Sequence, residues 1–442
     1  MSKNNILRKS LKVRLYPDRE QSILLNKTFG CCRLLYNERL HEHTEWYDQN
    51  KELPKSERST FKGKLPKQLR EEKYEFLGES IAEALINSQR NCEQAFNNFF
   101  RSCSGKRKGK KVGFPKFKSK KQHRDSFTLC MISENLLDWD HRTIKIPKLG
   151  KVKFRHAEDK KGKWIDWFKD ATPKHITVSK NPAGEYWCSI LFEKQEDIYS
   201  TIKLDNATGL DFSPNSLYIN DLNEVAPNYR KAKQENKKKL TKLERRLARK
   251  QKGSKNREKA RIKLARQEQY IANIRRDYRE KETLRLVKTY GVIGIEDLNL
   301  VGLARMSTNA KNYLDTSWST FVKRLEEKAK YNNCVVVKAD KFYPSSKTCN
   351  HCGYVKKDLR LSDRIWVCPE CGTEIIRDQN AALNLKENAI KIPVEDLKST
   401  LLLEQEEVRS VEGMEAEFCN GILCGVSYEA ENQSSDTLKG SL

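Results

Sequence analysis

The sequence contains no apolar run that approaches the roughly 20 residues a membrane-spanning helix needs, which excludes a membrane-spanning protein. Its first residues, MSKNNILRKSLKVRLYPDRE, lack the apolar core of a signal peptide, which argues against secretion. The 13 cysteines are odd in number and loosely spread, which argues against a disulfide scaffold. We therefore expect a protein of a reducing cytoplasm.

Acidic residues are scarce relative to basic ones. The 442 residues include 60 Asp and Glu against 86 Lys and Arg, a net charge of +26. Residues 101–121 hold 10 bases and no acid, and residues 231–290 hold 23 bases and 7 acids. One charge run usually marks only a solvated face, but two in so basic a chain indicate a polyphosphate partner, DNA or RNA. Residues 391–442 reverse the balance, with 11 acids and 4 bases, and predict a disordered tail.

Hydrophobic periodicity and turn residues predict two to four domains with mixed secondary structure. A strand at 5–15 precedes helices to about residue 100, and Asp18 lies near the start of the first helix. Short β-branched and aromatic segments bounded by Pro, Gly and Asn predict a β domain over 101–200. Further elements are expected in the second half: strands at 201–212, 217–219, 291–298 and 334–340, a helix around Trp318, and a basic helical hairpin at 229–290 broken at Gly253-Ser254.

Four cysteines have the spacing of a zinc site. Cys349 and Cys352 form one C-x2-C pair, Cys368 and Cys371 form another, and fifteen residues separate the pairs. Two such knuckles can place four thiolates around one ion, which is typical of structural rather than catalytic zinc. A glycine follows each pair and eases the turn.

Three acids stand where predicted strands end or a helix begins. Asp211 lies in GLDF, Glu296 ends VIGIE, and Asp378 lies in RDQNAALNL. An acid within an apolar strand is costly unless it is paired or holds a metal. Converging carboxylates suit two Mg²⁺ or Mn²⁺ ions that hydrolyse a phosphodiester. Taken singly, each acid could also have a purely structural role. Asp211 could form a turn, Glu296 could be a salt-bridge partner, and Asp378 could cap a helix. The neighbouring Asp297 would face the other side of the strand.

Several segments, in their order, resemble the TnpB (OrfB) family, RNA-guided nucleases of bacterial insertion sequences that were long described as transposases. They are GLDFS (209–213), GIEDLNL (294–300), FYPSSKTCNHCG (342–353), CPECG (368–372) and RDQNAALNL (377–385). The N-terminal KVRLYPDREQSILLNKTFGCCRLLYNERL and the middle segments FPKFKSKKQHRDSFTL and IKIPKLGKVKFR resemble the family too. The resemblance thus covers about residues 10–390.

The resemblance implies an α/β plus α+β multidomain chain with a RuvC-like (RNase H-like) nuclease domain at 201–345 and 375–390. A zinc ribbon at 346–374 would be inserted in it. A wedge-like β domain at 1–14 and 112–200 and a helical recognition domain at 15–111 would precede it. The segment 391–442 is not covered.

The resemblance also implies that Asp211, Glu296 and Asp378 are the RuvC carboxylates. A guide RNA from the end of the element would pair with target double-stranded DNA beside a short motif. The basic blocks would then contact RNA and heteroduplex by shape and backbone. Phe114, Phe117 and Phe127 could stack on nucleotides or pack in the core. We expect a bacterial, nucleoid-associated protein.

Three other functions remain open at the level of sequence. A small type V CRISPR effector shares the nuclease core and would differ in its neighbouring DNA. A non-catalytic nucleic-acid-binding regulator, or transposase accessory protein, would use only the basic surface and the ribbon. A strand-transfer transposase also uses three carboxylates but must join DNA ends.

Overall fold

The computed structural model describes residues 6–54, 57, 61–107, 109–122, 125–130, 134–155, 163–195, 206–306, 315–360, 362–392 and 396. The described chain falls into two compact units, one within residues 1–197 and one within residues 198–416. None of its helices in these ranges has the length and apolarity that a membrane span requires. The predicted acidic tail lies outside the described residues, except for Lys391, Ile392 and Asp396.

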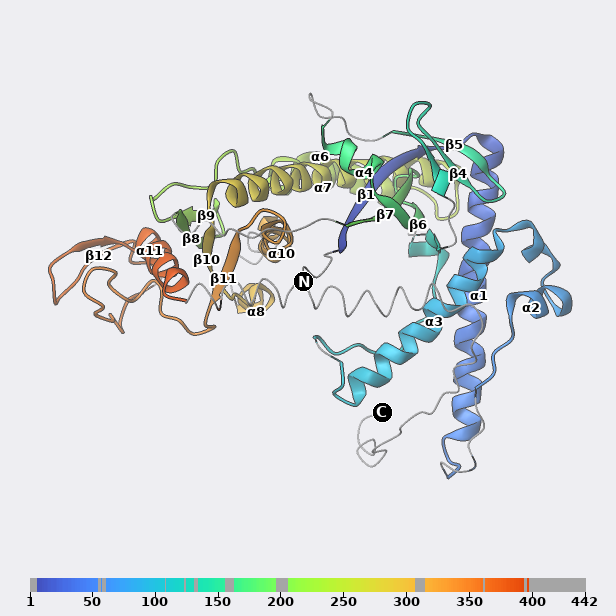
Figure 1. The fold of residues 1–442 in the computed structure, drawn as a ribbon, viewed down its shortest axis with the longest axis horizontal. Coiled ribbons are helices and arrows are strands. Elements are labelled where there is room, and N and C mark those ends of the chain that lie inside the picture. Colours follow the sequence, from blue (N-terminus) through green and yellow to red (C-terminus); the bar gives the residue numbers. More distant parts are fainter. Residues whose placement is uncertain are drawn as a thin grey trace. The chain divides into compact units, whose positions relative to one another are not determined.

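Unit 1 is built on a seven-stranded antiparallel sheet with the strand order β2-β6-β7-β1-β5-β4-β3 (Figure 1). The central strand β1 pairs with β7 from Ile6 opposite Gln195 to Leu15 opposite Tyr186, and also with β5. Alternate β1 side chains, those of Leu11, Val13 and Leu15, are buried. The strands are β1 (Ile6–Tyr16), β2 (Asp125–Leu129), β3 (Leu137–Asp138), β4 (Thr143–Ile146), β5 (Gly150–Arg155), β6 (Thr172–Lys180) and β7 (Tyr186–Gln195).

Between β1 and β2 the chain of unit 1 is helical. Helix α1 (Arg19–Asn50) begins where predicted, because the Asp18 carboxylate accepts a hydrogen bond from the Gln21 backbone in a capping box. Helix α3 (Ala82–Cys103) packs against α1. Shorter helices complete the unit: α2 (Pro66–Glu72), η2 (Glu75–Glu79), η3 (Lys120–Gln122), η4 (Glu134–Leu136) and α4 (Lys163–Lys169).

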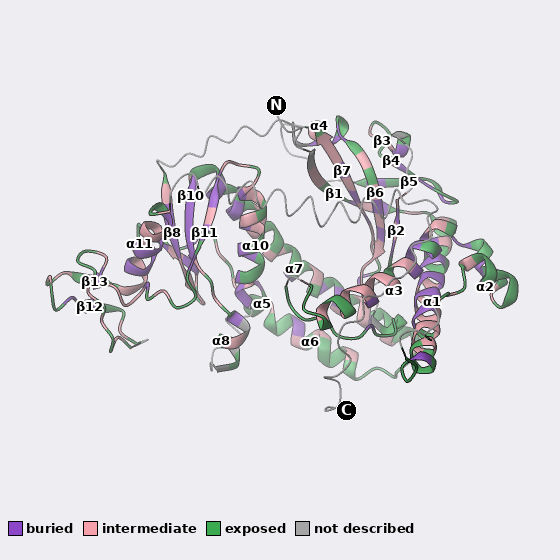
Figure 2. Ribbon diagram, turned by 60° about the horizontal axis from the view of Figure 1, so that its bottom comes forward, coloured by how far each residue is buried: buried purple, intermediate pink, exposed green. Residues whose placement is uncertain are grey.

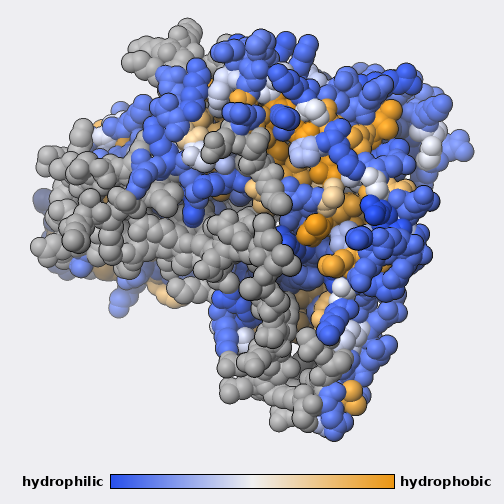
Figure 3. Space-filling view, turned by 45° about the vertical axis from the view of Figure 1, so that its right-hand side comes forward, coloured by the Kyte–Doolittle hydropathy of each residue, from blue (hydrophilic) through white to orange (hydrophobic). Residues whose placement is uncertain are grey.

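One hydrophobic cluster in unit 1 runs from the sheet to helices α1 and α3. Phe127 is part of it and is only 4% exposed, so it is a core residue, whereas Phe114 and Phe117 are exposed. Cys31 and Cys32 are buried as packing residues. The face in Figure 3 carries mainly hydrophilic side chains around a central group of hydrophobic ones. The predicted wedge and recognition domains thus share a core, and their separation stays a prediction.

Unit 2 contains a four-stranded sheet with the order β11-β10-β8-β9. Strands β8 (Ala207–Ser213), β10 (Val292–Glu296) and β11 (Val335–Ala339) are parallel, and β9 (Leu217–Asn220) is antiparallel to β8. One face packs on α10 (Trp318–Ala329) and on the end of α7 (Lys255–Thr289) through Trp318, Phe321 and Leu286. The parallel strands are buried along most of their length (Figure 2).

Helix α11 (Arg377–Ile390) covers the opposite face of this sheet at very short range. A Cβ at Gly209 would lie 1.8 Å from the Ala382 carbonyl oxygen, and one at Gly294 would lie 2.2 Å from that of Leu385. The two glycines are paired in register on β8 and β10. Only glycine therefore permits α11 to approach the sheet this closely.

The basic hairpin of unit 2 consists of α6 (Lys237–Ala248) and α7, and the break falls at Gly253-Ser254 as predicted. Gly253 has a φ of +85°, and Ser254 caps α7 through the Arg257 backbone. A small cluster centred on Leu240 and Ile271 holds the two helices together. Two short helices, α5 (Ala232–Glu235) and α8 (Leu300–Met306), complete the described elements outside the cysteine segment.

Candidate functional site

Strand geometry places two of the three predicted acids on the face that α11 covers. Asp211 follows Gly209 by two residues, and Glu296 follows Gly294 by two. Side chains two residues apart share a face of a strand, and these two strands are parallel neighbours in register. The two carboxylates therefore lie side by side, one step beyond the glycine contacts. Asp297, the first residue after β10, is exposed; its position on the other face stays a prediction.

Asp378 joins them from the first turn of α11. Residues 378, 382, 385 and 389 recur at helical spacing on one side of this helix, and Ala382 and Leu385 are its contacts with the glycines. The side of α11 that touches the strands therefore carries Asp378 at its beginning. Three acids, each more than eighty positions from the next in the chain, thus come from three different elements.

The three acids are linked through the ionisation of Asp211. Burial raises the pKa of Asp211 well above its ordinary value, and the negative charges of Glu296 and Asp378 raise it further. Burial also raises the pKa of Glu296. A bound cation would offset the charge of Glu296 and Asp378 that disfavours ionisation of Asp211. Their oxygen donors are those that Mg²⁺ and Mn²⁺ prefer, so the residues present fit such ions.

Two arginines lie beside the third acid. The Arg377 guanidinium donates to Asp378 Oδ1 at 2.9 Å, and Arg364 Nη1 lies 3.1 Å from Asp378 Oδ2. Arg364 comes from the segment between the two cysteine pairs, and its side chain is 65% exposed. Arg377 immediately precedes Asp378 in the chain, so this ion pair joins neighbouring residues at the start of α11.

Ser345 and two asparagines of α11 connect the acids to the cysteine segment. The Ser345 hydroxyl donates to the Glu296 carboxylate. Asn384 Nδ2 donates to the Ser345 carbonyl at 2.7 Å, and Asn380 Nδ2 donates to the Thr348 carbonyl at 2.7 Å. Both asparagines are buried, so these bonds form away from water and fix the chain between β11 and the first cysteine.

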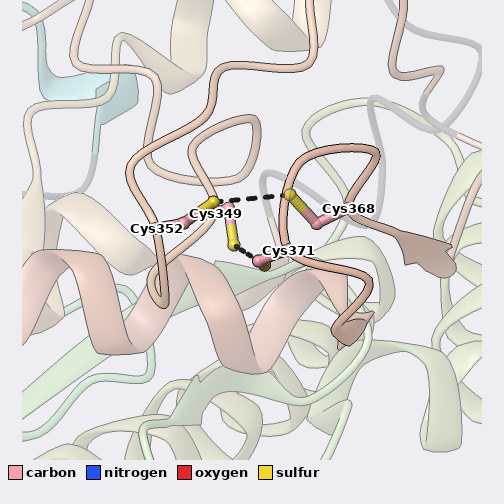
Figure 4. Close-up of side chains that lie close together, drawn as sticks. All are labelled: Cys349, Cys352, Cys368 and Cys371. Atoms are coloured by element: carbon pink, nitrogen blue, oxygen red, sulfur yellow. Dashed lines mark hydrogen bonds between the residues drawn. The ribbon is translucent and has the colours of Figure 1, made fainter.

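The four predicted cysteines converge in the structure (Figure 4). Two knuckles hold them: the Gly353 backbone donates to the Cys349 carbonyl, and the Gly372 backbone donates to that of Cys368, each at 2.9 Å. Both glycines have positive φ, +79° and +69°. Strands β12 (Ile365–Val367) and β13 (Glu374–Ile376) flank the second knuckle and pair with each other, and α11 follows β13 directly.

The sulfur positions fit a tetrahedral ion. All four lie within 4.8 Å of one another, with 3.8 Å between Cys349 and Cys371 and 3.5 Å between Cys352 and Cys368. Zinc–sulfur bonds of about 2.3 Å place tetrahedral sulfurs about 3.8 Å apart. Hydrogen bonds with the side chain and backbone of Thr373 lower the pKa of the Cys371 thiol to about 6. The pKa of Cys352 is raised to about 12: a backbone hydrogen bond with Tyr354 lowers it, but burial and hydrogen bonds with the other three sulfurs outweigh that bond. His351 is exposed, as expected of a residue outside the ligand set.

The sequence did not reveal Ser345, Arg364, Asn380 or Asn384 as site residues. Ser345 lies inside FYPSSKTC and the asparagines lie inside RDQNAALNL, so the segments were noticed but the contacts were not. No spacing rule connects a serine near a strand end with a glutamate 49 residues earlier. Only the topology, which brings the loop after β11 beside the end of β10, could have indicated the pair.

Three family models match parts of the chain. "Probable transposase" (OrfB_IS605) covers residues 189–307, and "Cas12f1-like, TNB domain" covers residues 318–385. A "Helix-turn-helix domain" model of OrfB covers residues 4–52, where the structure has strand β1 and the single helix α1 instead. A protein of Streptomyces pristinaespiralis, named "Putative RNA-guided DNA endonuclease", is 32% identical over 381 residues, 86% of this chain and 89% of its own length.

The chain belongs to the TnpB (OrfB) family. A second relative, InsQ of Escherichia coli, has the same descriptive name and is 28% identical over 85% of this chain and 91% of its own. Among solved structures, a Cas12f1 complex with single-guide RNA and target DNA matches at a TM-score of 0.47 and 12% identity. That match covers 86% of this TnpB-family chain and 99% of the other.

Proposed function

We propose that this TnpB-family protein is an RNA-guided DNA endonuclease whose reaction site is formed by Asp211, Glu296 and Asp378. The observation that carries the proposal is the convergence of these acids from β8, β10 and α11, which follows from the in-register pairing of the two strands and the close approach of α11 to both. The parallel core of unit 2 would then be a RuvC-like domain, with the cysteine segment inserted as a zinc ribbon. Unit 1 would contain the wedge and recognition domains.

The three carboxylates would hold two Mg²⁺ or Mn²⁺ ions. Such ions, when bound, activate a water and stabilise the leaving oxygen of a phosphodiester. The protein's own contribution is orientation: Ser345 fixes the Glu296 carboxylate, and α11 fixes Asp378 against the strands. Arg364 from the ribbon and Arg377 from the start of α11 hold Asp378. No residue of the chain needs to form a covalent intermediate.

The four cysteines would hold one structural Zn²⁺, because a closed set of four thiolates leaves no open position for a substrate. The basic hairpin of α6 and α7 would neutralise phosphates of a guide RNA and its DNA hybrid. Base pairing, rather than the side chains, would select the target. A short motif beside the target would be read within unit 1. The protein would act at the bacterial nucleoid.

The first test is to purify the protein from its native locus with flanking DNA and to sequence the RNA that accompanies it. One enriched RNA ending in sequence from beyond the element supports the proposal and defines a DNA target. Random RNA alone would remove the guided mechanism.

The second test is cleavage of that target with Mg²⁺. Asp211→Asn should lower the rate by at least about 1,000-fold, because carboxylate-held metal supplies several kcal/mol of transition-state stabilisation. RNA binding should stay within a few-fold. Asp297→Asn is the matched control, because this exposed acid follows Glu296 but lies beyond the end of β10. Retained cutting by Asp211→Asn would remove that residue from the site.

A CRISPR effector is the second candidate, favoured by the Cas12f1-like match over 318–385. The DNA that flanks the gene distinguishes the two candidates. A CRISPR repeat array supports the effector, and a transposon end supports the TnpB nuclease. An assay for joined DNA ends separates both from a strand-transfer transposase.

A further inference from the structure

Phe342 is the most exposed large apolar side chain in the described part of the chain. Its exposed fraction is 89%, whereas the next, that of Leu222, is 65%. A fully solvated phenyl ring forgoes about 2 kcal/mol or more that burial would contribute. Single exposed apolar residues are common, so exposure alone indicates nothing. The loop that presents this ring is what distinguishes it.

That loop is ordered by bonds on both sides of the ring. The Tyr343 backbone donates to the Asp340 carbonyl at 2.9 Å, and the Ser345 backbone donates to the Tyr343 carbonyl at 2.9 Å. The Tyr343 hydroxyl donates to the Asn384 carbonyl of α11 at 3.3 Å. The Ser345 hydroxyl is bonded to Glu296. Phe342 is therefore exposed on a loop that is held by several hydrogen bonds. Two of these bonds are to β10 and α11, which carry acids of the site.

The position of the loop relates it to the acids. Strands β10 and β11 are parallel, with Glu296 opposite Ala339, so β11 ends at the same edge of the sheet as the carboxylates. Phe342 follows Ala339 by three residues. Lys341 is its neighbour, and the Lys341 ammonium lies 5.6 Å from the ring centroid. An aromatic face and a cation therefore stand together beside the site.

We propose that Phe342 is a stacking platform for an unpaired base of single-stranded DNA whose backbone passes the three carboxylates. Stacking on an aromatic ring accepts every base, which suits a nuclease whose sequence choice lies in a guide. Lys341 supplies positive charge for the adjacent phosphate. The inference rests on the proposed function, because the acids explain why a DNA strand would come to this edge.

The test uses the full-length chain in Mg²⁺-free buffer with a short thymidine oligonucleotide that carries one central 2-aminopurine. Stacking quenches the fluorescence of this base. Phe342→Ala should weaken binding by about 5- to 100-fold and abolish the quenching. The salt slope should stay unchanged, because no charge is removed. Phe342→Tyr should retain both properties within about three-fold, since the π face remains.

Phe342→Leu separates stacking from apolar contact. Leucine keeps an apolar surface but has no π face, so it should behave like alanine. Leucine as good as phenylalanine would overturn the platform and indicate that an apolar contact with DNA, not base stacking, accounts for the binding. Tyr331→Ala is the matched control: Tyr331 is 45% exposed and precedes β11, at the edge of the sheet away from the acids. It should change neither binding nor quenching.

Cleavage assays distinguish failure of this inference from failure of the proposed function. If Asp211→Asn abolishes cutting while Phe342→Ala changes neither quenching nor the KM for DNA, the platform is wrong and the acid site stands. If Phe342→Ala loses quenching while Asp211→Asn still cuts, the platform stands and the acid site is wrong.

Discussion

The cysteine cluster and the carboxylate cluster of unit 2 both depend on a pair of glycines, but for different physical reasons. Gly353 and Gly372 adopt positive φ, and a Cβ on either would meet nothing within 4 Å. Gly209 and Gly294 lie in strands, and a Cβ on either would collide with the backbone of α11. The first pair permits a local turn, whereas the second permits two distant segments to touch. One site is therefore made by short-range conformation and the other by the packing of the whole unit.

The largest expected effect breaks the local site. Cys352→Ser should remove the zinc. The binding free energy of structural zinc in small domains is roughly 10 kcal/mol or more, and a site with three thiolates should lose most of that binding free energy. Elemental analysis of the purified protein should fall from one zinc to none. Cys103→Ser, an exposed cysteine of unit 1, is the control and should keep the zinc. One zinc retained by Cys352→Ser would contradict the four-cysteine centre.

A smaller effect distinguishes the two glycine pairs. Gly209→Ala should lower the free energy of unfolding by about 3 kcal/mol, because α11 must move away from a clashing Cβ. Gly353→Ala should cost about 1 kcal/mol through the left-handed conformation alone, and Gly353→Asn should cost less. Gly30→Ala, in helix α1 with open space around it, should be neutral or stabilising.

Denaturant melts of the four glycine variants would measure these differences. Equal costs at Gly209 and Gly353 would refute the distinction between packing and conformation. Gly209→Asn should lower the free energy of unfolding most, because its side chain adds volume where α11 already touches the strand. At Gly353 there is open space for a side chain, and asparagine tolerates the left-handed φ.

The smallest effect concerns charge in the distributed site. Asp211 has a raised pKa in the folded protein, so its contribution to stability is present below the ordinary value of 3.8 and is lost as the pH rises through the raised pKa. In Mg²⁺-free buffer at neutral pH, Asp211→Asn should therefore unfold at a higher temperature than the wild type. The gain should disappear below pH 3.8 and shrink with added Mg²⁺. A gain that is independent of pH would show that the ionised carboxylate is not strained.

The same contrast explains what could be predicted from the sequence. Asp18, Gly253 and the C-x2-C pairs act on neighbours a few residues away, so helix limits and the zinc ligands were visible in the printed order of residues. Asp211, Glu296 and Asp378 were visible as unusual acids, but resemblance to a family was needed to choose them over structural readings.

The remaining contacts depend on topology, which local patterns do not specify. Gly209 is part of the GLDF segment, but no residue near it in the sequence predicts its contact with Ala382. Ser345 likewise donates to a glutamate that only the parallel pairing of β10 and β11 brings within reach. The division of unit 1 into two domains stays a prediction, since its sheet and helices share one hydrophobic cluster.

Helix α11 touches the strands along one side, and this contact limits the insertions and deletions that the protein can accept. Asp378 and Ala382 lie one turn apart on the side that touches the strands, and each residue of a helix turns the next by about 100°. One residue inserted between them would rotate Asp378 away from Asp211 while leaving the rest of the helix seated. Between the cysteine pairs, Arg364 contacts Asp378 and β12 pairs with β13, so the part of the segment before Arg364 is where the chain can lengthen without disturbing that angle. Natural variation in length should therefore accumulate in the ribbon and be absent from the first turns of α11.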